Sequence, residues 1–235
     1  MKGFILTSIH EPARKQNVQN ILGRLQAIEP VEAIYPAFTH VPFLNRIKET
    51  AKHRAGHELR SGEVGCLLSH RKIWKLVNRK AADDNESFLV LESDSHLSNT
   101  RLLELEFDTI SGKYDLFFWG AWEGHMQLLR STMQQLDDVH RIGEPFIKTV
   151  YCTYGYSLNR KAAAYLLKRT RSVHYPVDQF KRFIEPGSLK IGGIVPELIS
   201  TLEMDSNIRP KINGIADTVF RKLLDIKNSV ICFLR

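Results

Sequence analysis

Short apolar runs alternate with longer stretches of helical periodicity along this chain, and that alternation constrains the fold more than any other feature. Strands that alternate with helices predict an α/β domain, here with a mostly parallel central sheet. Helical periodicity is clearest at residues 14–28, 63–79 and 159–170. The predicted strands are residues 3–9, 33–38, 87–92, 114–119, 147–151, 154–158 and 189–195.

Composition excludes several classes of protein. The chain has 235 residues, 43% hydrophobic and 25% charged, as expected of one globular domain with a modest appendage. No apolar run approaches the roughly 18–20 residues of a membrane span, and we expect residues 3–9 to be a buried strand rather than a leader. The three cysteines, Cys66, Cys152 and Cys232, are odd in number and far apart, which favours a reducing, cytoplasmic setting.

The net charge of +7 suggests an anionic partner, which could be nucleic acid, a membrane surface or a phosphorylated substrate. The sequence has no zinc-finger spacing, no aromatic RNA-binding motif and no basic recognition helix, so we expect no nucleic acid partner. It also lacks the glycine-rich P-loop and the dinucleotide fingerprint. A phosphorylated substrate or an anionic surface remains.

Two carboxylates follow the most apolar predicted strand. Phe88 to Leu91 is a continuous apolar run, typical of a strand buried on both faces, and Glu92-Ser93-Asp94-Ser95 follows it. Ligands in open α/β sheets bind beyond the carboxyl ends of the strands. Glu92 and Asp94 there could hold Mg²⁺ or Mn²⁺ against substrate phosphates. Alternatively, they are ordinary turn or helix-capping residues.

The second informative segment runs from Ser61 to Trp74 and reads Ser-Gly-Glu-Val-Gly-Cys-Leu-Leu-Ser-His-Arg-Lys-Ile-Trp. Ser61 could cap a helix, and Glu63 would lie in its first turn, near the positive end of the helix dipole. Gly65 costs helix stability relative to alanine and therefore indicates close packing. A tightly packed core helix is one interpretation of the segment, but it leaves the Ser69-His70 pair unexplained.

This segment resembles the hallmark of glycosyltransferase family 25, the lipooligosaccharide galactosyltransferases, and three further segments agree in order and spacing. Leu91-Glu92-Ser93-Asp94 is similar to that family's Leu-Glu-Asp-Asp metal motif, with Ser93 in place of the central carboxylate. The resemblance covers roughly residues 3–205. The other two similar segments are Thr153 to Ala163, which matches a strand that leads into a helix, and Pro176-Val177-Asp178.

The resemblance implies a type A nucleotide-diphospho-sugar transferase fold and an inverting transfer of a hexose to a lipooligosaccharide. The donor would be UDP-galactose, or alternatively UDP-glucose, and the cofactor Mn²⁺ or Mg²⁺ held by Glu92 and Asp94. Because Ser93 replaces a carboxylate, a non-catalytic sugar- or glycolipid-binding relative is the other alternative. The residues implied to bind the donor are Thr7, Ser8, Arg14, Glu63, Gly65, Ser69, His70 and Glu92. Of these, Arg14 carries a guanidinium, which suits a diphosphate.

Inversion in a single displacement needs a base on the acceptor hydroxyl, opposite the leaving diphosphate, as in the inverting hydrolases. Asp178 is the first candidate for the catalytic base, with a helix cap as the alternative role. Glu123 is the second candidate, because it follows Trp119-Gly120-Ala121-Trp122. The two tryptophans could stack on sugar rings or fill the core.

The C-terminal segment differs in character from the rest of the chain. We predict a catalytic domain at residues 1–206 and a basic amphipathic, helical extension at 207–235. The extension could lie on the anionic inner face of the bacterial inner membrane, pack back on the domain, or form a dimer contact. Its basic residues are Arg209, Lys211, Arg221, Lys222, Lys227 and Arg235, against Asp217 and Asp225.

Overall fold

The computed structural model describes residues 1–202, 227–229 and 231–233. Its helices are α1 (Lys15–Arg24), α2 (Leu44–Ala55), α3 (Ser61–Lys80), α4 (Thr100–Ser111) and α5 (Arg160–Arg169), and the 3-10 turns used below are η1 (Pro12–Arg14), η2 (Trp122–Gly124), η4 (Ile147–Thr149) and η5 (Phe180–Arg182). Its strands are β1 (Lys2–Thr7), β2 (Ile28–Glu32), β3 (Phe88–Leu91), β4 (Ser95–Leu97), β5 (Leu116–Gly120), β6 (Gln134–Gln135), β7 (Arg141–Gly143), β8 (Gly155–Leu158), β9 (Ile191–Val195) and β10 (Ile199–Thr201).

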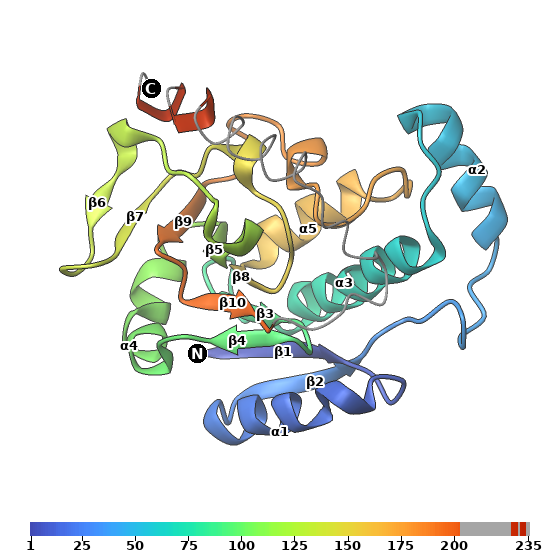
Figure 1. Cartoon of the computed structure of the whole chain (residues 1–235), viewed down its shortest axis with the longest axis horizontal. Coiled ribbons are helices and arrows are strands. Elements are labelled where there is room, and N and C mark those ends of the chain that lie inside the picture. The colour runs from blue at the N-terminus through green and yellow to red at the C-terminus, as the bar shows by residue number, and fades with distance from the viewer. Residues whose placement is uncertain (203–226, 230, 234–235) are drawn as a thin grey trace, which may run out of the picture.

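Eight strands form one sheet in the order β2-β1-β3-β8-β5-β9-β7-β6, and β10 pairs with β4 in a small second sheet (Figure 1). The predicted α/β class is confirmed. Strand β1 runs parallel to β2 and β3, and β5 runs parallel to β9. Strand β8 lies antiparallel between these two groups, and β7 and β6 extend the far edge in antiparallel fashion. The sheet is therefore mixed, and not mostly parallel as the sequence predicts. Sequence could not show the direction of each strand, because a strand buried on both faces has the same apolar pattern in either direction.

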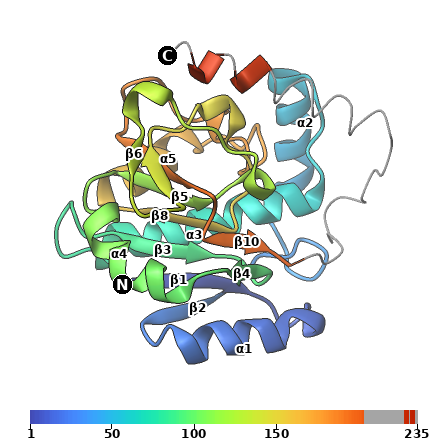
Figure 2. The same ribbon diagram turned by 60° about the vertical axis from the view of Figure 1, so that its left-hand side comes forward.

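The two faces of the sheet bury separate apolar cores. Side chains alternate along each strand, so Phe4 and Val90 face one core and Ile5 and Leu89 face the other. Helices α3 and α5 cover the first face, and they lie side by side in Figure 1. Helices α1 and α4 cover the second face (Figure 2). Helices on both faces leave the carboxyl ends of β1 and β3 as an accessible edge.

Most of the predicted elements are found, with shifted ends. The strands predicted at residues 3–9, 87–92, 114–119, 154–158 and 189–195 correspond to β1, β3, β5, β8 and β9. The strand predicted at 33–38 is wrong, because β2 ends at Glu32. The strand predicted at 147–151 is also wrong, because η4 occupies its first three residues. Strand β2 lies at the sheet edge and contains Pro30, which is tolerated there but hides the strand pattern.

The described part of the C-terminal segment packs on the domain. Residues 227–229 and 231–233 are helical, Gln127 Nε2 donates a hydrogen bond to Ser229 Oγ at 3.1 Å, and the Arg130 guanidinium lies 4.3 Å from the centre of the Phe233 ring. The predicted boundary at residues 206 and 207, and most of the predicted extension, lie outside the described residues. Within the described residues, none of the helices has the length and apolar character needed to span a bilayer.

Candidate active site

The loops that follow β1 and β3 meet at the carboxyl edge of the sheet. These strands are parallel neighbours, so their carboxyl ends lie side by side. Arg14, at the end of η1, is the centre of the contact. Its guanidinium lies 3.0 Å from Glu11 Oε1 and 3.1 Å from Asp94 Oδ2, and it donates a hydrogen bond to Ser93 Oγ at 3.1 Å. The structure thus brings together the predicted residues Arg14 and Asp94.

The loop after β3 is fixed by a compact set of hydrogen bonds. Ser95 caps the turn from its side chain, because its Oγ accepts from the backbone N–H of Glu92 at 2.9 Å. Asn17, on α1, donates through its side-chain amide to the carbonyl oxygens of Ser93 and Ser95, at 2.9 Å each. Ser93 Oγ, which is buried, donates to Glu11 Oε2 at 2.8 Å. These bonds hold Glu92 and Asp94 in place.

Asp94 has an environment that suits a cation ligand. Its pKa is raised from 3.8 to about 6, first by burial and then by the nearby charge of Glu92, against the opposing charge of Arg14. Its Oδ1 atom is buried and has no hydrogen-bond partner among the described residues. Buried polar atoms are normally paired, so an unpaired carboxylate oxygen beside a second carboxylate suits a bound cation.

Whereas Asp94 is paired with Arg14, Glu92 is held by Thr153 and His70. Its Oε1 accepts a hydrogen bond from the Thr153 hydroxyl and lies 3.2 Å from His70 Nε2. Burial raises the pKa of Glu92, but its interactions with His70, the hydrogen bond from Thr153 and the charge of Arg14 outweigh burial and bring the pKa below its usual value. Glu92 therefore loses its proton at a lower pH than Asp94, whose pKa of about 6 still leaves it mostly ionised at neutral pH.

The residues fit the hard divalent cation implied by the resemblance. Glu92 and Asp94 supply carboxylate oxygens, and Asp94 Oδ1 has no hydrogen-bond partner within the described part of the chain. Mg²⁺ and Mn²⁺ sites typically combine one or two carboxylates with substrate phosphates and water. Cys66, His70 and Glu92 form a second group whose ligand atoms all lie within 4.8 Å of one another. That group has the ligand types of a zinc site rather than a magnesium site.

Both candidate bases, like Glu92, lie close enough to Cys152 for their charges to act on its thiol. Burial raises the pKa of the Cys152 thiol well above its usual value, and the charges of Asp178, Glu92 and Glu123 raise it further. Because the charges of all three carboxylates act on this one thiol, the carboxylates lie around Cys152. Asp178 is half-buried and lies just before Gln179, the N-cap residue of η5, so it does not occupy the capping position that was its alternative role.

Glu123 belongs to a strained loop directly after β5. Trp122 and Glu123 have φ of 50° and 52°, a left-handed conformation that is unfavourable for residues other than glycine. The Glu123 N–H donates to the Tyr154 hydroxyl at 2.9 Å, and that hydroxyl donates to Glu197 at 2.7 Å. Trp122 is half-buried beside Tyr151, whereas Trp119 is fully buried and belongs to the core. Strained backbone held by such bonds is common at functional sites.

Four predicted donor-binding residues make structural contacts. Glu63 Oε2 accepts from the Arg60 N–H at 2.9 Å, and Arg60, not the predicted Ser61, is the N-cap of α3. Gly65 lies against the segment after β2, where an added Cβ would be 2.4 Å from the Ile34 carbonyl oxygen. Ser69 Oγ accepts from the Ile34 N–H at 2.7 Å. Ser8 Oγ, after β1, donates to a carboxylate oxygen of Glu32 at 3.0 Å.

Thr7 and His70 are the remaining predicted donor-binding residues. Thr7 ends β1 and is half-buried, and its carbonyl accepts from the Ala33 N–H at 2.8 Å. His70 is fully buried behind Glu92. Sequence reasoning missed Glu11, Asn17 and Thr153. Of these, only Thr153 had a signal, because it opens the family-like segment that contains β8.

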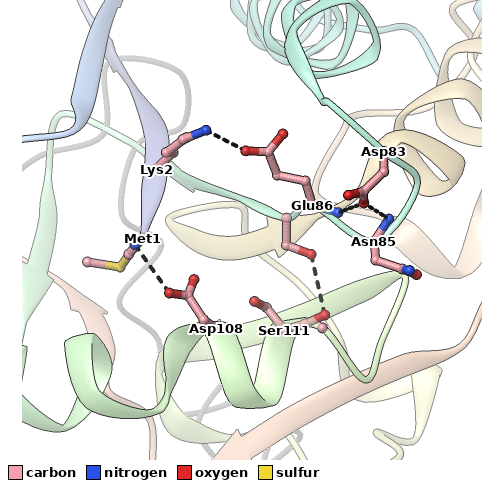
Figure 3. Close-up of a pocket in the computed structure, with 9 residues that line it drawn as sticks. Met1, Lys2, Asp83, Asn85, Glu86, Asp108 and Ser111 are labelled. Atoms are coloured by element: carbon pink, nitrogen blue, oxygen red, sulfur yellow. Dashed lines mark hydrogen bonds and ion pairs between the residues drawn. The ribbon is translucent and has the colours of Figure 1, made fainter.

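A pocket of about 400 Å³ lies at the other end of β1 and β3, away from these carboxylates (Figure 3). Its walls carry an ion pair between Lys2 and Glu86 at 2.6 Å and another between the N-terminal amine and Asp108 at 3.6 Å. Asp83 accepts from backbone N–H groups and closes the turn before β3. These groups are already paired with one another, and the pocket lies at the edge where ligands of α/β sheets do not usually bind.

Changing Ser93 to Asp should destabilise the protein by about 0.5–3 kcal/mol, the usual range for a destabilising single substitution. The new carboxylate would face Glu11, which now accepts the Ser93 hydroxyl bond at 2.8 Å. Urea unfolding of S93D measures the loss. The double variant S93D/E11Q should recover most of it and keep or raise Mn²⁺ affinity. If S93D is as stable as the unchanged protein, the Ser93–Glu11 contact is not a constraint on this motif.

An α/β sheet with a carboxylate pair and a guanidinium at its carboxyl edge is suited to a phosphate-bearing ligand. The chain belongs to glycosyltransferase family 25 (LPS biosynthesis protein), whose family model matches residues 1–181. The predicted family is thereby confirmed, and the match contains Arg14, Glu92, Asp94 and Asp178. Membership implies a sugar donor and an acceptor of lipopolysaccharide type. No curated protein matches the chain.

Proposed function

We propose that this chain is a metal-dependent, inverting hexosyltransferase that uses a UDP-sugar, in the first place UDP-galactose, and a lipooligosaccharide acceptor. The observation that carries the proposal is the buried Oδ1 of Asp94, which has no hydrogen-bond partner among residues 1–202, 227–229 and 231–233 and has the Glu92 carboxylate and the Arg14 guanidinium beside it. A type A nucleotide-diphospho-sugar transferase fold is part of the proposal. It is supported by the parallel β2-β1-β3 unit, whose carboxyl ends carry these residues.

Each group has a definite role in the proposed transfer. Bound Mn²⁺ or Mg²⁺ would neutralise negative charge on the leaving diphosphate. The Arg14 guanidinium would donate hydrogen bonds to diphosphate oxygens. Asp178 would take the proton of the acceptor hydroxyl as that oxygen attacks the anomeric carbon from the face opposite the diphosphate, and UDP would leave. Glu123 is the second candidate for the base.

An exposed ring pair next to the donor loop supports a nucleotide donor. His10 and Phe38 stack with ring centres 4.0 Å apart, and 66% of Phe38 is exposed. Aromatic faces beside a phosphate site can stack on a nucleobase. The pair follows β1 and β2, close to Ser8, so it would place the base at the same edge as the diphosphate.

Release of UDP by the purified protein tests the function. With Mn²⁺ and a lipooligosaccharide acceptor, we expect UDP release from UDP-galactose, its loss on adding EDTA, and its return with excess Mn²⁺. Full activity in EDTA would remove the metal from the proposal. Faster release from UDP-glucose would select that alternative donor. Sugar binding without release from either donor would favour the non-catalytic, sugar- or glycolipid-binding alternative.

Peripheral contact with the anionic inner face of the inner membrane is a further part of the proposal. It is supported by the excess of basic residues in the C-terminal segment, since each Lys or Arg near an anionic surface contributes about 1 kcal/mol.

Changing Arg209, Lys211, Arg221 and Lys222 together to Gln should reduce cosedimentation with anionic vesicles at low salt. The same change at exposed Arg24, Lys52, Lys75 and Arg79 is the matched control. Equal loss of vesicle binding in both variants would mean that binding depends on the overall charge of the protein and not on the C-terminal segment.

A further inference from the structure

A line of buried side chains connects α3 and β8 to Glu92. The Tyr156 hydroxyl oxygen lies 2.9 Å from Trp74 Nε1 and 2.9 Å from His70 Nδ1. The other ring nitrogen of His70, Nε2, lies 3.2 Å from Glu92 Oε1. Trp74, His70 and Tyr156 are fully buried, so water does not compete for these bonds.

The chemistry of the groups fixes the direction of each hydrogen bond. An indole N–H can only donate, so the Tyr156 oxygen accepts from Trp74. Burial raises the pKa of Tyr156 well above its usual value, so its hydroxyl keeps its one hydrogen. Among the described residues, His70 Nδ1 is the remaining group bonded to that hydroxyl, so Nδ1 accepts. The neutral imidazole then carries its hydrogen on Nε2 and donates it to Glu92.

Two donors therefore converge on one oxygen of Glu92. The Thr153 hydroxyl and His70 Nε2–H both bond to Oε1, which leaves Oε2 for a ligand. Outer partners of this kind orient a metal-binding carboxylate and keep it in its ionised form. Resting on the proposed function, we propose that Tyr156 is a positioning residue that holds His70 in the Nε2–H form and thereby aims the Glu92 carboxylate at the divalent cation.

The rival arrangement is a metal held by Cys66, His70 and Glu92, whose ligand atoms are close enough together. It would require the lone pair of His70 Nε2, so the ring hydrogen would move to Nδ1. Tyr156 would then accept from both Trp74 and His70, and its own hydrogen would have no acceptor among the described residues. A doubly protonated ring would leave the same hydrogen unpaired. The contacts therefore favour the Nε2–H form.

The chain offers a matched control for removing the Tyr156 hydroxyl. Ser157, the next residue on β8, is buried, and its Oγ accepts the indole N–H of Trp119 at 3.0 Å. Y156F and S157A each remove a buried hydroxyl bonded to an indole. Only Y156F breaks the connection to Glu92. A change found in Y156F and absent from S157A is thus not a general effect of losing such a bond.

Two measurements test the proposal, and the first needs no metal. In ¹⁵N NMR of the metal-free protein, His70, assigned by its loss in H70Q, should be the Nε2–H tautomer, and Y156F should shift it towards Nδ1–H. In the second measurement, the Mn²⁺ dissociation constant, followed by the electron paramagnetic resonance of free Mn²⁺, should rise about 10- to 100-fold in Y156F and stay unchanged in S157A. A Gln amide can donate to Glu92 without Tyr156. In the H70Q background, Y156F should therefore have little further effect.

The outcomes separate the proposal from the function on which it rests. An Nδ1–H tautomer in the unchanged protein, or equal effects of Y156F in both backgrounds, would overturn the positioning role. Tight Zn²⁺ binding that disappears in C66A and displaces Mn²⁺ would also overturn it, in favour of the rival site. The expected tautomer together with no Mn²⁺ binding by the unchanged protein would keep the orienting role towards Glu92 and refute the metal part of the proposed function.

Discussion

Changing Asp178 to Asn should slow turnover by at least about 10²-fold, the low end of the contribution of a positioned general base. Asparagine keeps the size of the side chain but cannot take the proton of the acceptor hydroxyl. Affinity for UDP-sugar should change little, because the base faces the acceptor and the diphosphate is assigned to Arg14 and the metal. Single-turnover transfer and donor titration measure the two effects separately.

Glu123→Gln is the matched control, because Glu123 also lies within range of the Cys152 sulfur and is the second candidate. Near-normal turnover in D178N with a large loss in E123Q would transfer the role to Glu123. A helix cap would instead predict a fall in thermal stability in D178A and none in D178N, because asparagine caps a helix as well as aspartate does. The structure makes that fall unexpected, because Gln179 occupies the N-cap position of a single 3-10 turn. Normal turnover in both variants would mean that neither carboxylate is the base.

The parts of the fold that could be predicted are those in which local pattern and burial agree. The apolar runs of β3 and β5 are buried on both faces, and the strong periodicity of α3 gave nearly its full length. Helix α2 was missed because it buries little, with only Ala51 fully inside. Weakly buried helices and edge strands such as β2 carry little apolar pattern, so their signal is faint.

In the candidate site, too, some residues could be predicted from the sequence and others could not. Glu92 and Asp94 could be found because they follow a buried strand, where the sheet places its ligands. Their partners could not be found from spacing. Glu11 lies 82 positions from Ser93, and Tyr156 lies 86 from His70, so only the packed sheet brings these side chains together. The hallmark residues Gly65 and Ser69 show the converse, because their chemistry serves packing against the segment after β2.

Changing Arg14 to Ala should lower kcat/KM for the sugar donor by about 10²- to 10³-fold, the usual loss on removing one preorganised charge donor. Its guanidinium would bond the diphosphate, and it now lies within about 3 Å of both Glu11 and Asp94. Without it these carboxylates lose their positive partner, which strongly destabilises a buried group. R14K keeps the positive charge but loses the planar, paired N–H donors of the guanidinium. It should therefore be more stable than R14A and show a smaller loss of kcat/KM.

Metal binding distinguishes the two roles of Arg14. If the guanidinium balances the carboxylates, Mn²⁺ should raise the melting temperature of R14A by more than that of the unchanged protein, because the cation would replace the missing charge. If it binds the donor, UDP affinity should fall in R14A and partly in R14K. Exposed Arg24, at the end of α1, is the control, and R24A should change neither quantity. Unchanged UDP affinity in a folded R14A would place the diphosphate away from the loop after β1, and with it the donor half of the proposed site.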